Sequence, residues 1–158
     1  MAAQVDALKE KLRQWTILLG VFQVTVGCLV GFIPPTAVQY FRGIVMAHIE
    51  FAMNGILMIA LGFLVRELRL NPLALKIWFV LLQIGTWTNG GAGVIMAFTG
   101  ATTKLAPTMT EKFPPPNGDN SGLVTATLMV CGVTILAALI ITLYGLWRTM
   151  AAPKNMTA

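Results

Sequence analysis

Apolar residues gather in four long runs along the chain, and polar residues lie mostly between them. The runs cover residues 15–33, 43–65, 73–99 and 122–147. Each has roughly the 20 residues that an α-helix needs to cross the hydrocarbon core of a bilayer. The pattern predicts an all-α fold: an integral membrane four-helix bundle that forms a single domain over residues 1–158. The segment 100–121 is predicted to be a loop outside the membrane, either an ordered cap or a flexible one.

The composition agrees with a membrane protein. Of the 158 residues, 56% are hydrophobic and 11% are charged, whereas a soluble domain has about 25% charged residues. The net charge of +5 comes from Lys and Arg at the ends of the apolar runs, with no basic stripe among aromatics. Nucleic acid is therefore not expected as a partner. Cys28 and Cys131 lie inside apolar runs and are interpreted as small buried hydrophobes.

The positions of Lys and Arg predict how the bundle is oriented. The side that holds both termini has eight of them: Lys9, Lys11, Arg13, Arg66, Arg69, Lys76, Arg148 and Lys154. The other side has three: Arg42, Lys104 and Lys112. Because cytoplasmic segments of membrane proteins carry an excess of Lys and Arg, both termini are predicted to be cytoplasmic.

The second apolar run holds the residues most suited to chemistry. It contains the chain's only histidine, His48, together with Glu50 and Asn54, in the stretch A-H-I-E-F-A-M-N-G. Ionisable groups at membrane depth are costly and mark functional sites, and imidazole is a common ligand of metals and haem iron. Glu50 and Asn54 are four residues apart and share a helix face, while His48 lies about 120° away from Asn54. The helix is thus predicted to direct His48 toward one neighbour and the Glu50–Asn54 pair toward another.

The third run carries a polar residue in a stripe of small ones. Gly85, Asn89, Gly93 and Ala97 recur every four residues, and such a stripe lets helices or a flat cofactor approach closely. Asn89 is predicted to hydrogen-bond with Glu50 or Asn54. A purely structural interpretation fits these residues too, since intramembrane Asn and Gln often only hold helices together, and a histidine often only bonds a backbone carbonyl. From the residues alone, the prediction is a bundle with one polar intramembrane site and no identified reaction.

Several motifs resemble a known family. A-H-I-E-F-A-M-N-G, the turn R-L-N-P-L-A-L, G-T-W-T-N on the third run and the ending L-Y-G-L-W-R are similar to hydroxylaminobenzene mutases, which resemble styrene oxide isomerase. The resemblance covers the three C-terminal helices. The family pattern on the third run reads Tyr-x-Asn-Trp, where this chain has Trp87 and Gly90. These two positions and Gly93 are candidates for a substrate pocket with an altered shape.

The resemblance implies a cofactor and an assembly. Styrene oxide isomerase is a small homotrimeric membrane enzyme that holds haem b between neighbouring subunits. The matching residues imply that His48 is the axial ligand and that Asn54 and Asn89 line the pocket on the other haem face. Glu50 is added as a catalytic candidate because it lies at membrane depth and shares a helix face with Asn54. The implied setting is a multi-pass protein of the bacterial inner (cytoplasmic) membrane.

The implied reaction is an isomerisation of a small apolar aromatic substrate that partitions into the lipid bilayer. Ferric haem acts as a Lewis acid on the substrate oxygen, and an aryl epoxide becomes an aldehyde by a 1,2-hydride shift. One alternative is a hydroxylaminobenzene mutase that converts an arylhydroxylamine to an aminophenol. Another is a non-enzymatic transporter or redox-partner subunit in which His48 and Glu50 relay protons.

Overall fold

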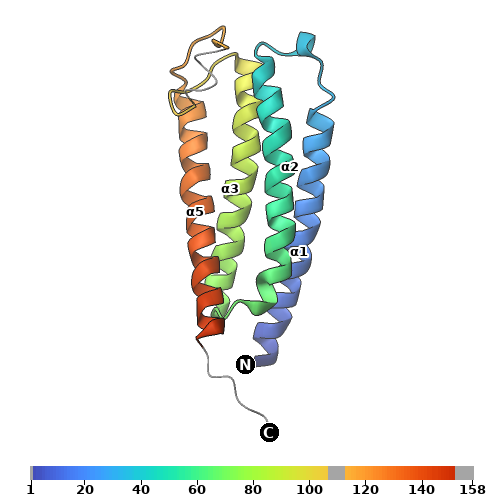
Figure 1. Ribbon diagram of the computed structural model, residues 1–158, viewed down its shortest axis with the longest axis vertical. Coiled ribbons are helices and arrows are strands. Elements are labelled where there is room, and N and C mark those ends of the chain that lie inside the picture. Colours follow the sequence, from blue (N-terminus) through green and yellow to red (C-terminus); the bar gives the residue numbers. More distant parts are fainter. Residues whose placement is uncertain (1, 107–112, 152–158) are drawn as a thin grey trace.

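The computed structural model describes residues 2–106 and 113–151, and these residues form a bundle of four long helices (Figure 1). The long helices are α1 (Ala2–Val30), α2 (Phe41–Leu64), α3 (Pro72–Thr99) and α5 (Gly122–Met150), with short 3-10 helices η1 (Pro35–Ala37) and η2 (Val65–Glu67). The prediction of an all-α, four-helix fold is confirmed.

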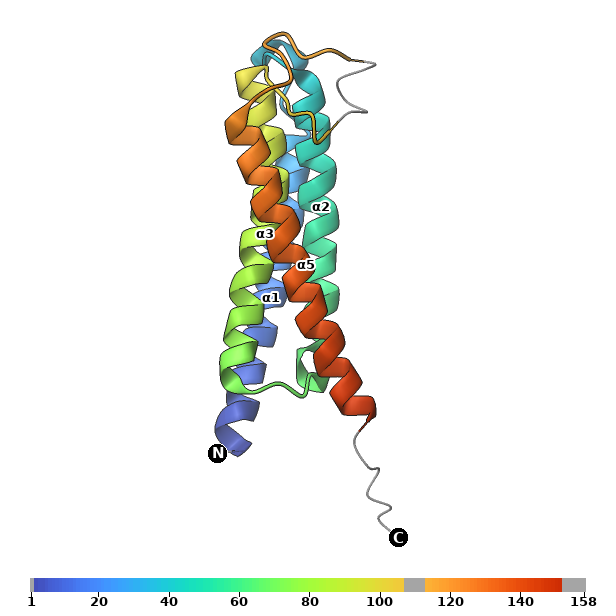
Figure 2. The same ribbon diagram turned by 90° about the vertical axis from the view of Figure 1, so that its left-hand side faces the viewer.

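Three of the four helices are apolar enough to cross a membrane. Within the described chain these are α1, α2 and α5, whereas α3, which contains the predicted run 73–99, is not among them. The helix α3 has 28 residues and is long enough. It carries Lys76, Gln83, Asn89 and several glycines, and these lower its hydropathy. The helix α3 packs between α2 and α5 (Figures 1 and 2), and Gln83 and Asn89 are half-buried there, whereas Lys76 is exposed.

The helices pack in chain order. The main contacts are of α1 with α2, α2 with α3, and α3 with α5. The start of α1 and the end of α5 lie at the same end of the bundle, beside the turn between α2 and α3 (Figure 1). We call this the terminal end. The opposite end, which holds the connection 31–40 and the described residues of 100–121, is the loop end.

Glycines allow the backbones of α2 and α3 to touch. Gly43 and Gly93 face each other, and a Cβ on Gly93 would lie 2.8 Å from the carbonyl oxygen of Gly43. Gly85 lies on another face of α3, where a Cβ would lie 2.8 Å from the hydroxyl of Thr134 on α5. The predicted small-residue stripe therefore serves two helix contacts, because i to i+4 positions drift by about 40° per step around the axis.

The terminal end contains the main apolar core. Trp78 is fully buried there, and its indole Nε1 donates a hydrogen bond of 2.8 Å to the hydroxyl of Thr142 on α5. At the surface of the same end, Glu10 of α1 binds Arg13 and, at 2.6 Å, Arg66 of η2. The remaining buried apolar residues of this core are Leu12, Met58, Leu61, Val65, Leu68, Leu70, Leu75, Leu82 and Ala138.

The first helix ends earlier than the apolar pattern suggests. It begins in the charged lead-in at Ala2 and stops at Val30, three residues before the predicted end at Ile33. Pro34 and Pro35 explain the difference, because the residue before a proline is pushed away from helical geometry.

The described parts of the loop 100–121 form an ordered cap. The side chain of Asn117 donates to Gln39 Oε1 at 2.8 Å and to the carbonyl of Thr99 at 2.7 Å. Thr103 pairs with Asn120 through an isolated β-bridge. The loop is thereby attached to the segment that precedes α2 and to the end of α3.

Candidate functional site

His48 lies at the surface of the bundle, where α2 meets the end of α1. Its Nδ1 is 2.8 Å from the carbonyl oxygen of Gly27. A carbonyl can only accept, so Nδ1 carries the proton and donates this hydrogen bond. The other ring nitrogen, Nε2, then has a free lone pair. An imidazole held in this way by a backbone carbonyl is oriented to bind a metal through Nε2.

The end of α1 is shaped to accept the imidazole. A Cβ on Gly31 would lie 2.8 Å from Nδ1 of His48 and 3.3 Å from its Cε1. A Cβ on Gly27 would lie 3.1 Å from the carbonyl oxygen of His48. The sequence analysis did not single out Gly27 and Gly31. Two glycines four residues apart at the end of an apolar run could have predicted a close helix contact at this point.

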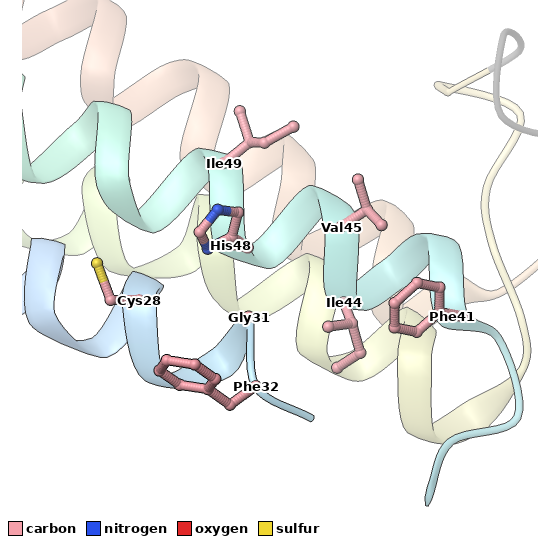
Figure 3. Close-up of a pocket in the computed structure, with 8 residues that line it drawn as sticks. All are labelled: Cys28, Gly31, Phe32, Phe41, Ile44, Val45, His48 and Ile49. Carbon is pink, nitrogen blue, oxygen red and sulfur yellow. The ribbon is translucent and has the colours of Figure 1, made fainter. Parts of the chain in front are cut away.

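A groove of about 380 Å³ lies beside His48, between α1 and α2 (Figure 3). We call it the His48 groove. Apart from His48 its lining is apolar or weakly polar: Cys28, Gly31, Phe32, Phe41, Ile44, Val45 and Ile49. Cys28 is exposed here, so its interpretation as a buried hydrophobe was wrong, whereas Cys131 is buried. The groove offers one nitrogen ligand in an apolar setting.

A second polar site joins α2, α3 and α5. Asn89 Nδ2 donates a short hydrogen bond of 2.5 Å to Glu50 Oε2, which confirms that Asn89 pairs with one of the two predicted residues. The thiol of Cys131 on α5 lies beside Glu50 and Thr88. Asn54, one turn after Glu50, is buried, and its Nδ2 has no hydrogen-bond partner among the described residues. A buried donor without a partner costs about 1–3 kcal/mol.

The His48 groove and the Glu50–Asn89 site lie on different sides of α2. His48 contacts α1, and Glu50 contacts α3. His48 and Glu50 are two residues apart in the helix, so their side chains point about 160° apart around the helix axis. One protomer therefore does not bring His48 together with Glu50 and Asn89 around a single ligand.

Trp87 and Gly90 belong to an aromatic cluster that fills the space between α1, α2 and α3. The Trp87 ring centroid lies 5.8 Å from that of Phe22 and 5.7 Å from that of Phe51. A Cβ on Gly90 would collide with the Phe51 ring. Gly93, by contrast, lies in the backbone contact between α2 and α3. Sequence analysis missed Phe22 and Phe51, although Phe51 stands within the motif that contains His48.

Fold and site together define a small helical membrane protein with a histidine in an apolar groove and a Glu–Asn pair between its helices. The chain belongs to the styrene oxide isomerase family, whose sequence profile matches residues 12–147. It is 28% identical over 140 residues to hydroxylaminobenzene mutase HabB of Ectopseudomonas oleovorans, a match that covers 89% of this chain and 84% of that protein. No solved structure matches the chain. The family and the relative support a membrane isomerase or mutase.

Proposed function

We propose that this protein is a haem b-dependent isomerase of small apolar aromatic compounds, embedded as a homotrimer in the bacterial inner membrane. His48 would hold the haem iron through Nε2. One observation carries the proposal: His48 gives its Nδ1 proton to the Gly27 carbonyl at 2.8 Å and keeps Nε2 for a ligand in the His48 groove.

Three features of the His48 groove fit a haem. The imidazole tautomer is fixed by a backbone carbonyl, as is usual for metal-bound histidines. The lining is apolar and suits the face of a porphyrin. Gly31 has no side chain, which leaves the imidazole room beside α1. The groove is also open toward the outside of the bundle, so one protomer covers only one face of a flat macrocycle.

A neighbouring subunit completes the site in this proposal. The Glu50–Asn89 pair lies on the other side of α2 from His48, so the pair of one protomer can meet the haem bound by the next. Such a contact joins two different surfaces of the protomer. In a closed ring every subunit uses both surfaces, so every His48 site is completed by a neighbour. The resemblance to styrene oxide isomerase sets the proposed number of subunits at three.

Each polar residue of the second site has a role in catalysis. When bound, ferric haem supplies a Lewis acid for the substrate oxygen. Asn89 gives one N–H to Glu50 and keeps a second N–H, and Asn54 has an amide nitrogen without a partner among the described residues. These amides orient the substrate and stabilise the charge that develops on its oxygen, an effect worth about 3 kcal/mol per donor. Glu50 holds the Asn89 amide in place.

The proposed reaction moves atoms within one molecule. In an aryl epoxide the benzylic C–O bond breaks, and a hydride shifts from the neighbouring carbon to give an aldehyde of the same composition. Enclosure of the substrate between the haem and the neighbouring subunit protects the cationic character of the benzylic carbon from water. A second candidate is the conversion of an arylhydroxylamine to an aminophenol, which the mutase relative favours. The family favours both over a transporter or redox-partner subunit.

Feeding two substrates side by side tests the proposal. Purified protein in detergent is given styrene oxide and phenylhydroxylamine separately, and products are identified by chromatography. We expect an aldehyde from the first or an aminophenol from the second, and no product from His48→Ala. Turnover of neither substrate would contradict the reaction, and full activity of His48→Ala would contradict the role of the imidazole.

A further inference from the structure

We propose that Arg42 anchors the propionate groups of the haem. This inference rests on the proposed function, because it takes the haem to be bound at His48. Arg42 is the only Lys or Arg in α2. It lies at the loop end of the outward face of α2, the face that carries Val45 and Ile49. His48 borders this face, about 120° from Arg42 around the helix axis, and Val45 and Ile49 line the groove between them. Farther along the same face, Met53 and Ile56 are exposed and apolar.

The position of His48 along α2 decides which way the propionates point. Two propionates on one edge of a haem carry two negative charges, which are costly inside a bilayer unless they reach its boundary or a cation. His48 is seven residues from the start of α2 at Phe41 and sixteen from its end at Leu64. At 1.5 Å per residue, the loop end is about 10 Å away and the terminal end about 24 Å away. The shorter path leads the propionates to the loop end.

Arg42 stands at the matching height. It precedes His48 by six residues, which corresponds to about 9 Å along the helix axis. This distance is comparable to that from the iron of a haem to its propionate carboxylates. A haem plane that lies against α2 with its propionate edge toward the loop end therefore brings a carboxylate within reach of the long Arg42 side chain.

The loop cap holds the Arg42 guanidinium ready for an anion. Its central carbon lies 3.4 Å from the centroid of the Phe113 ring. The Phe113 carbonyl accepts a hydrogen bond of 2.7 Å from the Tyr40 hydroxyl, which fixes the ring in place. A guanidinium stacked by its face keeps its N–H groups along the edge, where they bind a carboxylate in a bidentate manner. Among the described residues, both ion pairs use Glu10, and neither uses Arg42.

Arg42 has a competing structural role that the test must separate. Its stack on Phe113 would by itself attach the cap to α2. Phe113→Leu removes the stack but keeps the charge of Arg42. Lys104→Gln is the matched control for charge, because Lys104 is an exposed cation at the same end of the bundle.

The experiment measures how fast haem leaves the purified protein in detergent when excess apomyoglobin is the acceptor. We expect Arg42→Gln to release haem at least about tenfold faster than wild type, as for a lost hydrogen bond to a charged group. Its Soret maximum should not shift, since the axial ligand is unchanged. Arg42→Lys should fall between the two. Lys104→Gln should match wild type, and Phe113→Leu, which keeps the charge of Arg42 but loses the stack, should lie closer to wild type than to Arg42→Gln.

Haem dimethyl ester gives a second readout. In this compound both propionates are neutral, so wild type and Arg42→Gln should release it at equal rates. Unequal rates for the ester, equal rates for ordinary haem, or a Phe113→Leu variant as fast as Arg42→Gln would each overturn the anchor and leave the His48 site standing. A wild-type protein that binds no haem would instead overturn the proposed function together with this inference.

Discussion

Gly31, which directly follows α1, and His48 of α2 fit each other because Gly31 has no side chain. A methyl group on Gly31 would reach to 2.8 Å from Nδ1 of His48, the atom that donates to the Gly27 carbonyl. Contact at that distance is repulsive between a carbon and a ring nitrogen without a hydrogen bond. The backbone of α1 thus sets both the position and the tautomer of the imidazole, which links the packing of two helices to the ligand that the site offers.

The first prediction concerns this contact. Gly31→Ala should push the imidazole away from α1, break its bond to Gly27 and lower the haem content of the purified protein severalfold. Haem content is measured by the pyridine haemochrome assay. Gly132→Ala is the control, because a Cβ there meets nothing within 4 Å. Equal haem content in the two variants would show that the fit does not matter for binding.

The second prediction separates haem binding from catalysis. Asn89→Ala removes an amide donor proposed to act on the substrate and should lower kcat by roughly 100-fold. Haem content should stay at the wild-type level, because His48 lies on another side of α2. Thr127→Ala serves as the control, since the Thr127 hydroxyl bonds, among the described residues, only the Leu123 carbonyl of its own helix. A kcat that does not change would remove Asn89 from the catalytic site.

The third prediction tests whether the site is shared between subunits. Alone, His48→Ala should be inactive and Asn89→Ala should keep only about a hundredth of the wild-type kcat. When they are co-expressed with different affinity tags and purified through both, mixed oligomers should regain part of the activity, because one interface then has an intact His48 and an intact Asn89. If mixed oligomers stay inactive, the two residues act within one subunit or at separate sites.

The fourth prediction concerns the close contact of α2 and α3. Gly93→Ala should destabilise the protein by about 1–3 kcal/mol, because its Cβ would lie 2.6 Å from the backbone nitrogen of Ala47, which can yield only if the helices separate. Gly91→Ala on the same helix meets nothing within 4 Å and should be neutral. Thermal unfolding in detergent compares the two variants, and a neutral Gly93→Ala would contradict the packing.

The fifth prediction concerns the core of the terminal end. Thr142→Val keeps the shape of the side chain but leaves the buried Trp78 indole N–H without its acceptor. A donor left unpaired in this way costs about 1–3 kcal/mol. Thermal unfolding in detergent reports the change. Stability equal to that of Thr127→Val would show that the hydrogen bond contributes nothing.

Local rules were sufficient to predict the helices and the division of the second helix into faces. The angle between His48 and Glu50 follows from helix geometry alone, and so does their contact with different neighbours. Asn89 was expected to bond Glu50 or Asn54, because a buried amide in an apolar run needs a partner. These predictions use only the spacing of residues along one helix, which can be read directly from the sequence.

Other parts of the site depend on how helices meet, which spacing does not encode. Cys28 lies in an apolar run but is exposed, because α1 ends beside an open groove. Gly27 became important only through the crossing of α1 and α2, which brings its carbonyl to His48. The tilted ring contact of Trp87 with Phe51 likewise needs the registry of α3 against α2. The sequence identifies such residues as apolar or small and leaves their neighbours unspecified.

The absorption spectrum of the detergent-solubilised protein, recorded before and after dithionite, tests the central claim most directly. The account predicts a Soret band in the wild-type protein that shifts on reduction, and its loss in His48→Ala while the helices remain folded by circular dichroism. A colourless wild-type protein with full isomerase or mutase activity would contradict it.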